Sequence, residues 1–137
     1  MAAESTAVTE KDSFISLPSH PVGYVAVLAT LVTATIHLFL GPRVMGFSQL
    51  LGTLFILNGL GFLGGGVLYL SRYWRSELYL VAAGYALVTV LAFFAFQGFG
   101  VEAFFNRGSL NQMAVAAKAV ELVLAACAGY LYTNAPT

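Results

Sequence analysis

The sequence has 137 residues, of which 59% are apolar and 9% are charged, and its formal net charge is zero. Soluble domains carry about 25% charged residues, so this composition excludes an ordinary water-soluble domain and predicts a protein that lies in a lipid bilayer. Because the charge is balanced and no run of like charges occurs, the basic surface that nucleic-acid binding requires is also excluded.

The chain begins with a polar segment, residues 1–18, which starts MAAESTAVTEKDSFIS and carries three acidic residues against one lysine. A secretory signal would instead begin with a basic leader before a short apolar core. We therefore expect a disordered N-terminal tail and no cleaved signal.

Four long apolar stretches follow within residues 19–132, and each is near or above the roughly 20 residues that a helix needs to cross a bilayer. The predicted spans cover residues 22–40, 44–70, 77–98 and 110–132, and residues 133–137 form a short C-terminal tail. The sequence thus predicts an all-α fold, an antiparallel bundle of four transmembrane helices in a polytopic membrane protein.

Residues that favour helix ends mark the limits of these spans. Pro21 is suited to the first turn of the first helix, and Gly41-Pro42 predicts a tight break before the second. The pattern Ser109-x-x-Gln112 predicts a capping box at the start of the fourth helix. The loop before it, residues 98–108, is either a plain connector or a short turn lying on the membrane surface.

The positions of aromatic and basic residues predict how the chain is oriented in the membrane. With four crossings, every Tyr and the single Trp fall in the half that holds both termini, and most Phe residues fall in the other half. On the terminal side lie Lys11, Arg72 and Arg75, against Arg43 and Arg107 opposite. Because cytoplasmic loops carry an excess of Lys and Arg, we expect a multi-pass protein of the cell membrane with both termini in the cytoplasm.

Apart from Glu77 at the start of the third, Lys118 and Glu121 are the only charged residues inside the predicted spans. A charge in hydrocarbon costs about 2.5–3.5 kcal/mol or more unless it is paired or faces a polar cavity. Three residues apart on a helix, the two side chains share a face and can neutralise each other. The pair is therefore either a structural element that fixes helix register or a protonatable or ligand-binding site at Glu121.

Two further polar residues reach a similar depth, by the rise of about 1.5 Å per residue. His37 lies near the end of the first span and Asn58 near the middle of the second. We expect a polar cluster of His37, Asn58, Lys118 and Glu121. His37 is otherwise explained by a bond to a backbone carbonyl or to a neighbour on the Thr33 side, and Asn58 by a packing amide between helices.

Small residues predict how the helices pack. Gly61-x-x-x-Gly65 in the second span is a close-packing motif, and we expect it to serve helix packing rather than bending. In the first span, Ala26, Thr30, Thr33 and His37 recur on one helical face. These faces indicate a single bundle core.

Nothing in the sequence predicts a catalytic site, a metal site or a cofactor. Cys127 is the only cysteine, and one buried histidine cannot supply both axial ligands of a haem. Met45 and Met113 are too few for a copper path. The glycine-rich stretch GLGFLGGG lies inside a span, where a soluble nucleotide site cannot be.

The motifs IHLFLG at the end of the first span, LNGLGFL in the second and KAVELVL in the fourth give the chain a family likeness. It resembles small four-helix integral membrane proteins of archaeal type with no assigned function. This resemblance implies a four-span fold and a membrane location, and it supplies no activity.

Two functions are compatible with these features. The first is a non-enzymatic membrane protein in a lipid bilayer, a homo-oligomer or an accessory or assembly subunit of a larger complex, built on small-residue helix faces. The alternative is a proton- or ion-coupled carrier of a small solute, in which Glu121 loads and releases a proton while Lys118 and His37 tune its affinity.

Overall fold

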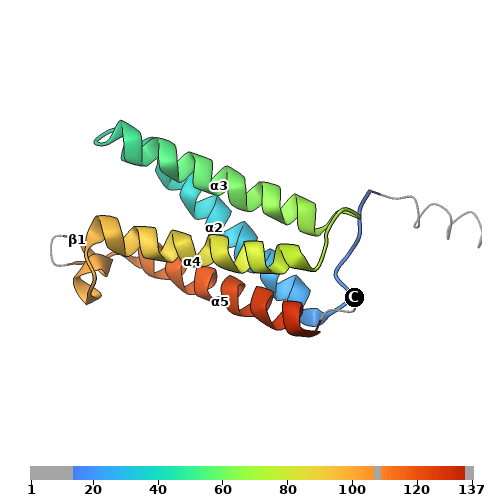
Figure 1. Ribbon diagram of the computed structural model, residues 1–137. Helices are drawn as coiled ribbons and strands as arrows, with labels where there is room; N and C mark the ends of the chain where they lie inside the picture. Colours follow the sequence, from blue (N-terminus) through green and yellow to red (C-terminus); the bar gives the residue numbers. More distant parts are fainter. Residues whose placement is uncertain (1–13, 107–108, 135–137) are drawn as a thin grey trace, which may run out of the picture.

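The computed structural model describes residues 14–106 and 109–134 and is an all-α bundle of four long helices (Figure 1). By length and composition, all four helices are able to cross a membrane. The 3-10 helix η1 and the two-residue strands β1 and β2 lie between the third and fourth helices. The elements are α2 (Pro21–Met45), α3 (Gln49–Tyr69), α4 (Glu77–Gln97), η1 (Val101–Phe104), β1 (Phe105–Asn106), β2 (Ser109–Leu110) and α5 (Gln112–Asn134).

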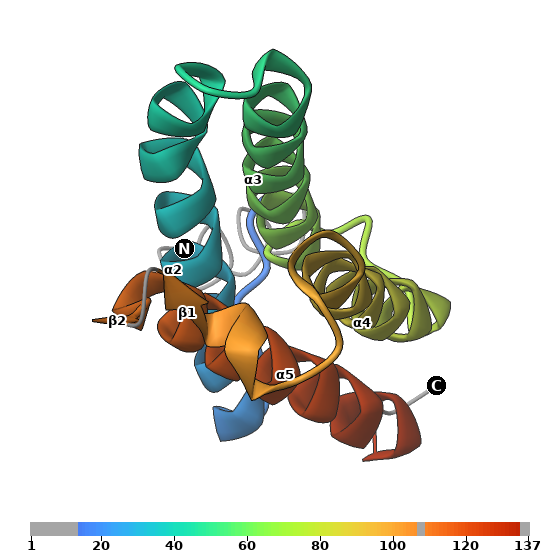
Figure 2. The same cartoon turned by 90° about the vertical axis from the view of Figure 1, so that its left-hand side faces the viewer.

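The helices do not pack equally against one another. Helix α2 packs on both α3 and α5, and α4 packs on α5, whereas α3 and α4 make few contacts. Figure 2, which views the bundle near its long axis, shows α3 standing away from α5. Neighbouring helices therefore pack closely at three of the four interfaces of the bundle, and they pack loosely at the interface between α3 and α4.

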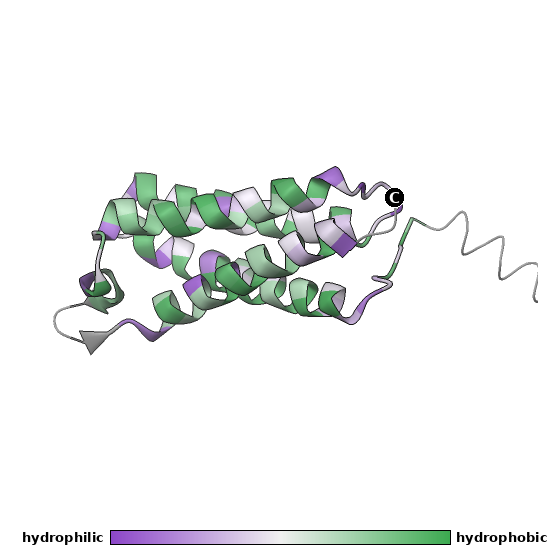
Figure 3. Ribbon diagram, turned by 60° about the horizontal axis from the view of Figure 1, so that its bottom comes forward, coloured by the Kyte–Doolittle hydropathy of each residue, from purple (hydrophilic) through white to green (hydrophobic). Residues whose placement is uncertain are grey.

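The core consists mainly of small side chains. Many large apolar side chains of all four helices are exposed, and Figure 3 shows hydrophobic residues along the helices. Such a surface is typical of a bundle surrounded by hydrocarbon rather than by water. The core cluster is Ala26, Ala29, Ala34, Phe62, Ala86 and Leu124.

Three glycines of α3 allow the close approach of α2. A Cβ atom at Gly52 would lie 2.8 Å from the Gly41 carbonyl oxygen, and one at Gly59 would lie 2.8 Å from Cγ of Leu38. At Gly66 it would lie 3.3 Å from Cγ2 of Thr30. Because these glycines recur every seven residues, they share one helix face, and this face packs on α2.

The predicted break at Gly41-Pro42 is wrong, because α2 continues through both residues to Met45. Pro42 lies in the last turn of the helix, where its missing N–H removes a single backbone bond. Gly41 packs against Ile56 of α3. The chain turns only after Met45, and α3 then begins with Ser48, whose Oγ accepts a bond from the Leu51 N–H at 3.2 Å.

The side chains that precede the first and last of the four long helices cap their N-termini. His20 caps α2, because its Nδ1 accepts a hydrogen bond from the Val22 N–H at 3.0 Å. Helix α5 is capped by Asn111, whose Oδ1 accepts from the Ala114 N–H at 3.1 Å. The capping box predicted from Ser109 is therefore wrong, since Ser109 belongs to β2.

The structure describes the last residues of the N-terminal segment and the end of α5. The Ser16 N–H donates to the Leu70 carbonyl at 2.6 Å, and the Arg72 N–H donates to the Phe14 carbonyl at 2.9 Å. These bonds hold the end of the N-terminal segment against the loop between α3 and α4. Residues 1–13 and 135–137 lie outside the described residues, and α5 extends to Asn134 rather than ending before residue 133.

Candidate functional site

A buried polar cluster connects α2 to α5 in the interior of the bundle. It consists of Thr33 and His37 on α2 and of Lys118 and Glu121 on α5. Both Glu121 and Thr33 have no exposed surface, His37 is 4% exposed and Lys118 is 6% exposed. The cluster is therefore sealed from the surroundings by the helices that carry it.

The two charged residues form an ion pair within α5. Nζ of Lys118 lies 2.7 Å from Oε1 of Glu121, a distance typical of a charge-assisted contact. The ammonium group also lies 5.2 Å from the ring centroid of Phe93 on α4, within range of a cation–π interaction. Lys118 is thus stabilised by a carboxylate on one side and by an aromatic ring on another.

Thr33 supplies the hydrogen bond that joins α5 to α2. Its hydroxyl donates to Oε2 of Glu121 at 2.5 Å. Thr33 was expected on the packing face of the first span but not among the site residues. The signal that could have indicated it is its spacing from His37, since residues four apart on a helix are neighbours.

The hydrogen bonds of His37 determine which of its nitrogens faces the carboxylate. Nδ1 lies 2.8 Å from the carbonyl oxygen of Thr33, and a carbonyl oxygen can only accept, so Nδ1 carries the hydrogen. Nε2 is then the atom that lies 3.8 Å from Oε2 of Glu121. The rings of Phe55 and Phe62 flank the imidazole, with centroids 5.3 Å and 6.1 Å away.

The cluster balances its own charge. With Lys118 and Glu121 ionised and His37 neutral, the four side chains carry no net charge, so neither buried ion is left without an opposite charge. Chemically, the arrangement can hold a proton on Nε2 of His37 or on the carboxylate. Within residues 14–106 and 109–134, no group of three or more His, Cys, Asp and Glu side chains could hold a metal ion.

Asn58 makes its hydrogen bonds with α4 rather than with this cluster. Its Oδ1 accepts from the Thr89 hydroxyl at 3.3 Å, and its backbone carbonyl accepts from the Tyr85 hydroxyl at 3.0 Å. The structure therefore brings together three of the four predicted residues, His37, Lys118 and Glu121, and gives Asn58 a separate role in linking α3 to α4.

The two glycines of the predicted packing motif also differ from each other. A Cβ atom at Gly61 would collide with the Tyr85 hydroxyl, so Gly61 does allow a close helix contact, with α4. At Gly65 a Cβ atom would meet nothing within 4 Å. Both glycines line a cavity.

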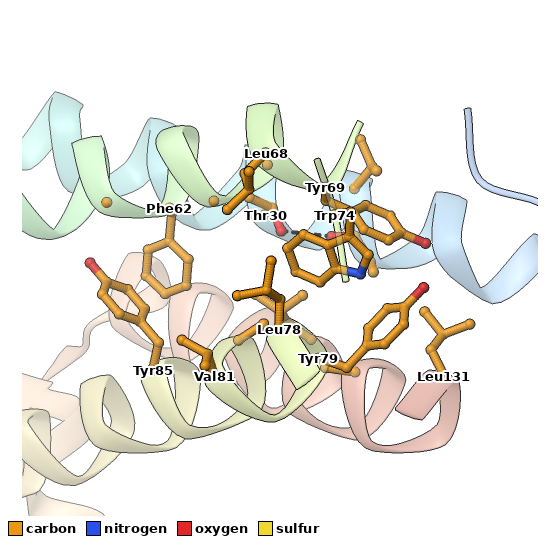
Figure 4. A pocket seen from close by; sticks show the side chains of 18 residues that line it. Thr30, Phe62, Leu68, Tyr69, Trp74, Leu78, Tyr79, Val81, Tyr85 and Leu131 are labelled. Atoms are coloured by element: carbon orange, nitrogen blue, oxygen red, sulfur yellow. Dashed lines mark hydrogen bonds between the residues drawn. The ribbon is translucent and has the colours of Figure 1, made fainter. Parts of the chain in front are cut away.

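This cavity has a volume of about 200 Å³ and lies among the four helices, bordered by α3 and α4 (Figure 4). Its walls are almost entirely apolar. Phe62 connects the cavity to the polar cluster, because its ring both lines the cavity and lies against His37. An apolar space and a charged network thus lie side by side, separated by one aromatic ring.

Comparison with known proteins gives a family for the chain and no characterised relative. The chain matches no curated protein and no solved structure. A model of a family of unknown function, DUF7475, matches residues 8–132, which include α2, α3, α4, all but the last two residues of α5 and the whole polar cluster. The chain therefore belongs to the DUF7475 family.

Proposed function

We propose that the protein is a multi-pass component of the cell membrane with both termini in the cytoplasm. We also propose that it is not an enzyme, and that it acts as a homo-oligomer or as an accessory or assembly subunit of a membrane complex. Four helices of 21 to 25 residues with an apolar circumference support the membrane location. The distribution of buried and exposed side chains supports the subunit role.

The observation that carries the subunit role is the contrast between a closed interior and an uncovered helix. Oε2 of Glu121 accepts a hydrogen bond from Thr33, and Oε1 is ion-paired with Lys118 but accepts no hydrogen bond from the described residues. Each side chain of the cluster is at most 6% exposed, which leaves little surface for a substrate. In the most apolar 18 residues of each helix, by contrast, 11% are buried in α4 and 17% in α3, against 39% in α2 and in α5. Helix α4 therefore has the largest face available for a partner helix.

A small residue on this face would allow a partner to approach closely. Gly84 on α4 is exposed, and a Cβ atom there would meet nothing within 4 Å. It lies among the exposed side chains of Leu80, Leu87 and Val88. A glycine within a larger apolar surface is the kind of contact through which helices associate in lipid.

The test is the mass of the protein in native membranes and in nanodiscs, measured by crosslinking and native mass spectrometry. We expect a species larger than the monomer in wild type, and its loss in Gly84→Leu. The matched control is Gly129→Leu on α5, where a Cβ atom likewise meets nothing within 4 Å. A monomer at every concentration, without a co-purifying subunit, would contradict the subunit role.

The contact between His37 and Glu121 favours a second candidate, the proton-coupled carrier of a small solute. Nε2 of His37 and Oε2 of Glu121 face each other at 3.8 Å, so a proton could be held by either group. Solute uptake into liposomes under a pH gradient tests this candidate. Uptake by wild type that is lost in Glu121→Gln would support the carrier, and absence of uptake in both would exclude it.

A further inference from the structure

We propose that the cavity between α3 and α4 binds one hydrocarbon chain of a membrane lipid, and that an oxygen at the polar end of this lipid accepts a hydrogen bond from Nε1 of Trp74. This inference rests on the membrane location proposed above but not on the subunit role. It assigns a ligand to a space that the polar cluster does not use.

The cavity has the dimensions of a narrow chain. On α4 its lining residues extend from Leu78 to Tyr85, which corresponds to about 10 Å along the helix axis at a rise of 1.5 Å per residue. Its volume of about 200 Å³ is distributed over this length. A helix of a partner protein has a diameter of about 10 Å and is too wide to enter.

The chemistry of the walls selects an apolar occupant. The lining side chains are almost entirely apolar, and the Thr30 hydroxyl among them already donates to the Ala26 carbonyl at 2.8 Å. An ordered water needs two to four polar partners, whereas dry apolar cavities of comparable size bind apolar molecules. Hydrocarbon is therefore a better occupant than water or a polar solute.

The cavity is reached from the side of the bundle that faces lipid. Helices α3 and α4 make few contacts with each other, and Leu68 and Val81, which line the cavity, are exposed. Gly65 contributes to this opening, since a Cβ atom there would meet nothing within 4 Å. A lipid chain could enter laterally, without passing through the polar cluster.

One end of the cavity offers a hydrogen-bond donor. Nε1 of Trp74 is buried, and among the residues that the structure describes it has no hydrogen-bond partner. Figure 4 shows the indole beside the cavity, next to Tyr69, with its nitrogen on the ring edge toward Tyr79. A buried N–H without an acceptor is costly.

The position of Trp74 matches the polar end of a lipid. It lies in the loop between α3 and α4, at the level where Trp and Tyr side chains meet lipid headgroups in a spanning protein. Its ring contacts Tyr69 and Tyr79, with centroids 4.9 Å and 5.2 Å away. The tail would then extend inward to Phe62 and Tyr85, whose rings pack edge to face at 4.8 Å.

A pair of adjacent glycines provides the test. Gly65→Leu places a side chain into the cavity, whereas Gly64→Leu makes the same change on α3 at a position that does not line it, and neither new Cβ meets an atom within 4 Å. Native mass spectrometry of the detergent-solubilised protein measures retained lipid. We expect one lipid per chain in wild type and Gly64→Leu, and retention roughly tenfold lower in Gly65→Leu.

The single Trp gives a second and independent measurement. Because Trp74 is the only tryptophan, its fluorescence reports the cavity alone when a dibrominated phospholipid is titrated into mixed micelles. Quenching should saturate at a low mole fraction of brominated lipid in wild type and rise linearly in Gly65→Leu. If Gly65→Leu does not fold, Trp74→Phe is used in the mass experiment, where loss of the N–H should reduce retention several-fold.

Three outcomes would overturn the proposal. They are linear quenching in wild type, equal lipid retention in Gly65→Leu and Gly64→Leu, and a wild-type dimer that only Gly65→Leu converts to a monomer. The last result would mean that a second copy covers the cavity. Failure of the membrane location would be recognised separately, because the expressed protein would then remain in the soluble fraction after cell lysis.

Discussion

The hydroxyl of Thr33 on α2 donates a 2.5 Å hydrogen bond to Oε2 of Glu121 on α5, across 88 positions of the chain. This bond connects two helices that are adjacent in the bundle but are the first and last in sequence of the four long helices that the structure describes. Because Lys118 engages the other carboxylate oxygen, the same side chain links an ion pair within α5 to a neighbouring helix. The Lys118–Glu121 ion pair is therefore held at one depth in the bundle and is also oriented toward α2.

The first prediction concerns this hydrogen bond. Thr33→Val keeps the shape of the side chain and removes the donor to Glu121, so we expect the free energy of unfolding to fall by about 1.5–3 kcal/mol, the range for a bond to a charged group. The measurement is unfolding of the protein in mixed micelles by increasing SDS. Thr35→Val is the control, because Thr35 is exposed on the same helix. Equal losses in both variants would show that Thr33 does not stabilise the carboxylate.

The second prediction concerns the charges. Lys118→Met or Glu121→Gln alone leaves one buried charge without its partner, and we expect each to destabilise the bundle by about 3–5 kcal/mol. The double variant removes both charges and should be more stable than the sum of the single effects implies. A double-mutant cycle measured by the same SDS unfolding determines the coupling. Additive effects would mean that the 2.7 Å contact contributes no pairing energy.

The sequence predicts the helices well because the length of an apolar stretch determines whether it can cross a bilayer. It locates their ends less well. Gly41-Pro42 indicates a break, but a proline in the last turn removes only one backbone bond, so α2 continues to Met45. Asn111 was missed as a cap because the pattern from Ser109 to Gln112 has the spacing of a capping box, and only the structure shows that α5 begins at Gln112.

The candidate site shows a different limit of sequence reasoning. Counting residues along a helix gives the depth of a side chain but not the direction in which it points relative to other helices. Depth alone groups His37 and Asn58, yet the first faces Glu121 and the second bonds to Thr89 on α4. Lys118 and Glu121 are predicted together because they share one helix, where spacing determines both depth and direction.

The third prediction concerns the packing of α2 on α3. In Gly52→Ala the new methyl group would lie 2.8 Å from the Gly41 carbonyl oxygen and 2.5 Å from the Met45 nitrogen, both of which are backbone atoms that cannot rotate away. The helices must separate, and we expect a loss of about 1–3 kcal/mol in the free energy of unfolding, as for other overpacked sites. Gly64→Ala is the control, since its methyl group meets nothing within 4 Å. If both variants unfold at the same SDS fraction, α2 and α3 do not pack as closely as described.

The fourth prediction concerns topology, and it tests the membrane location itself. In a Cys127→Ala background, single cysteines at Ser16 and Asn134 lie near the end of the bundle where α2 begins and α5 ends, whereas cysteines at Phe47 and Glu102 lie in the connections at the opposite end (Figure 1). An even number of crossings puts the first two on one side of the membrane and the last two on the other. A maleimide that does not cross membranes, added to intact cells, should therefore label Phe47→Cys and Glu102→Cys only.

Labelling at Ser16 and Asn134 instead would reverse the orientation, which depends on a small excess of Lys and Arg. Labelling at one terminal position but not the other would exclude four crossings, and labelling of all four would place the bundle outside the bilayer.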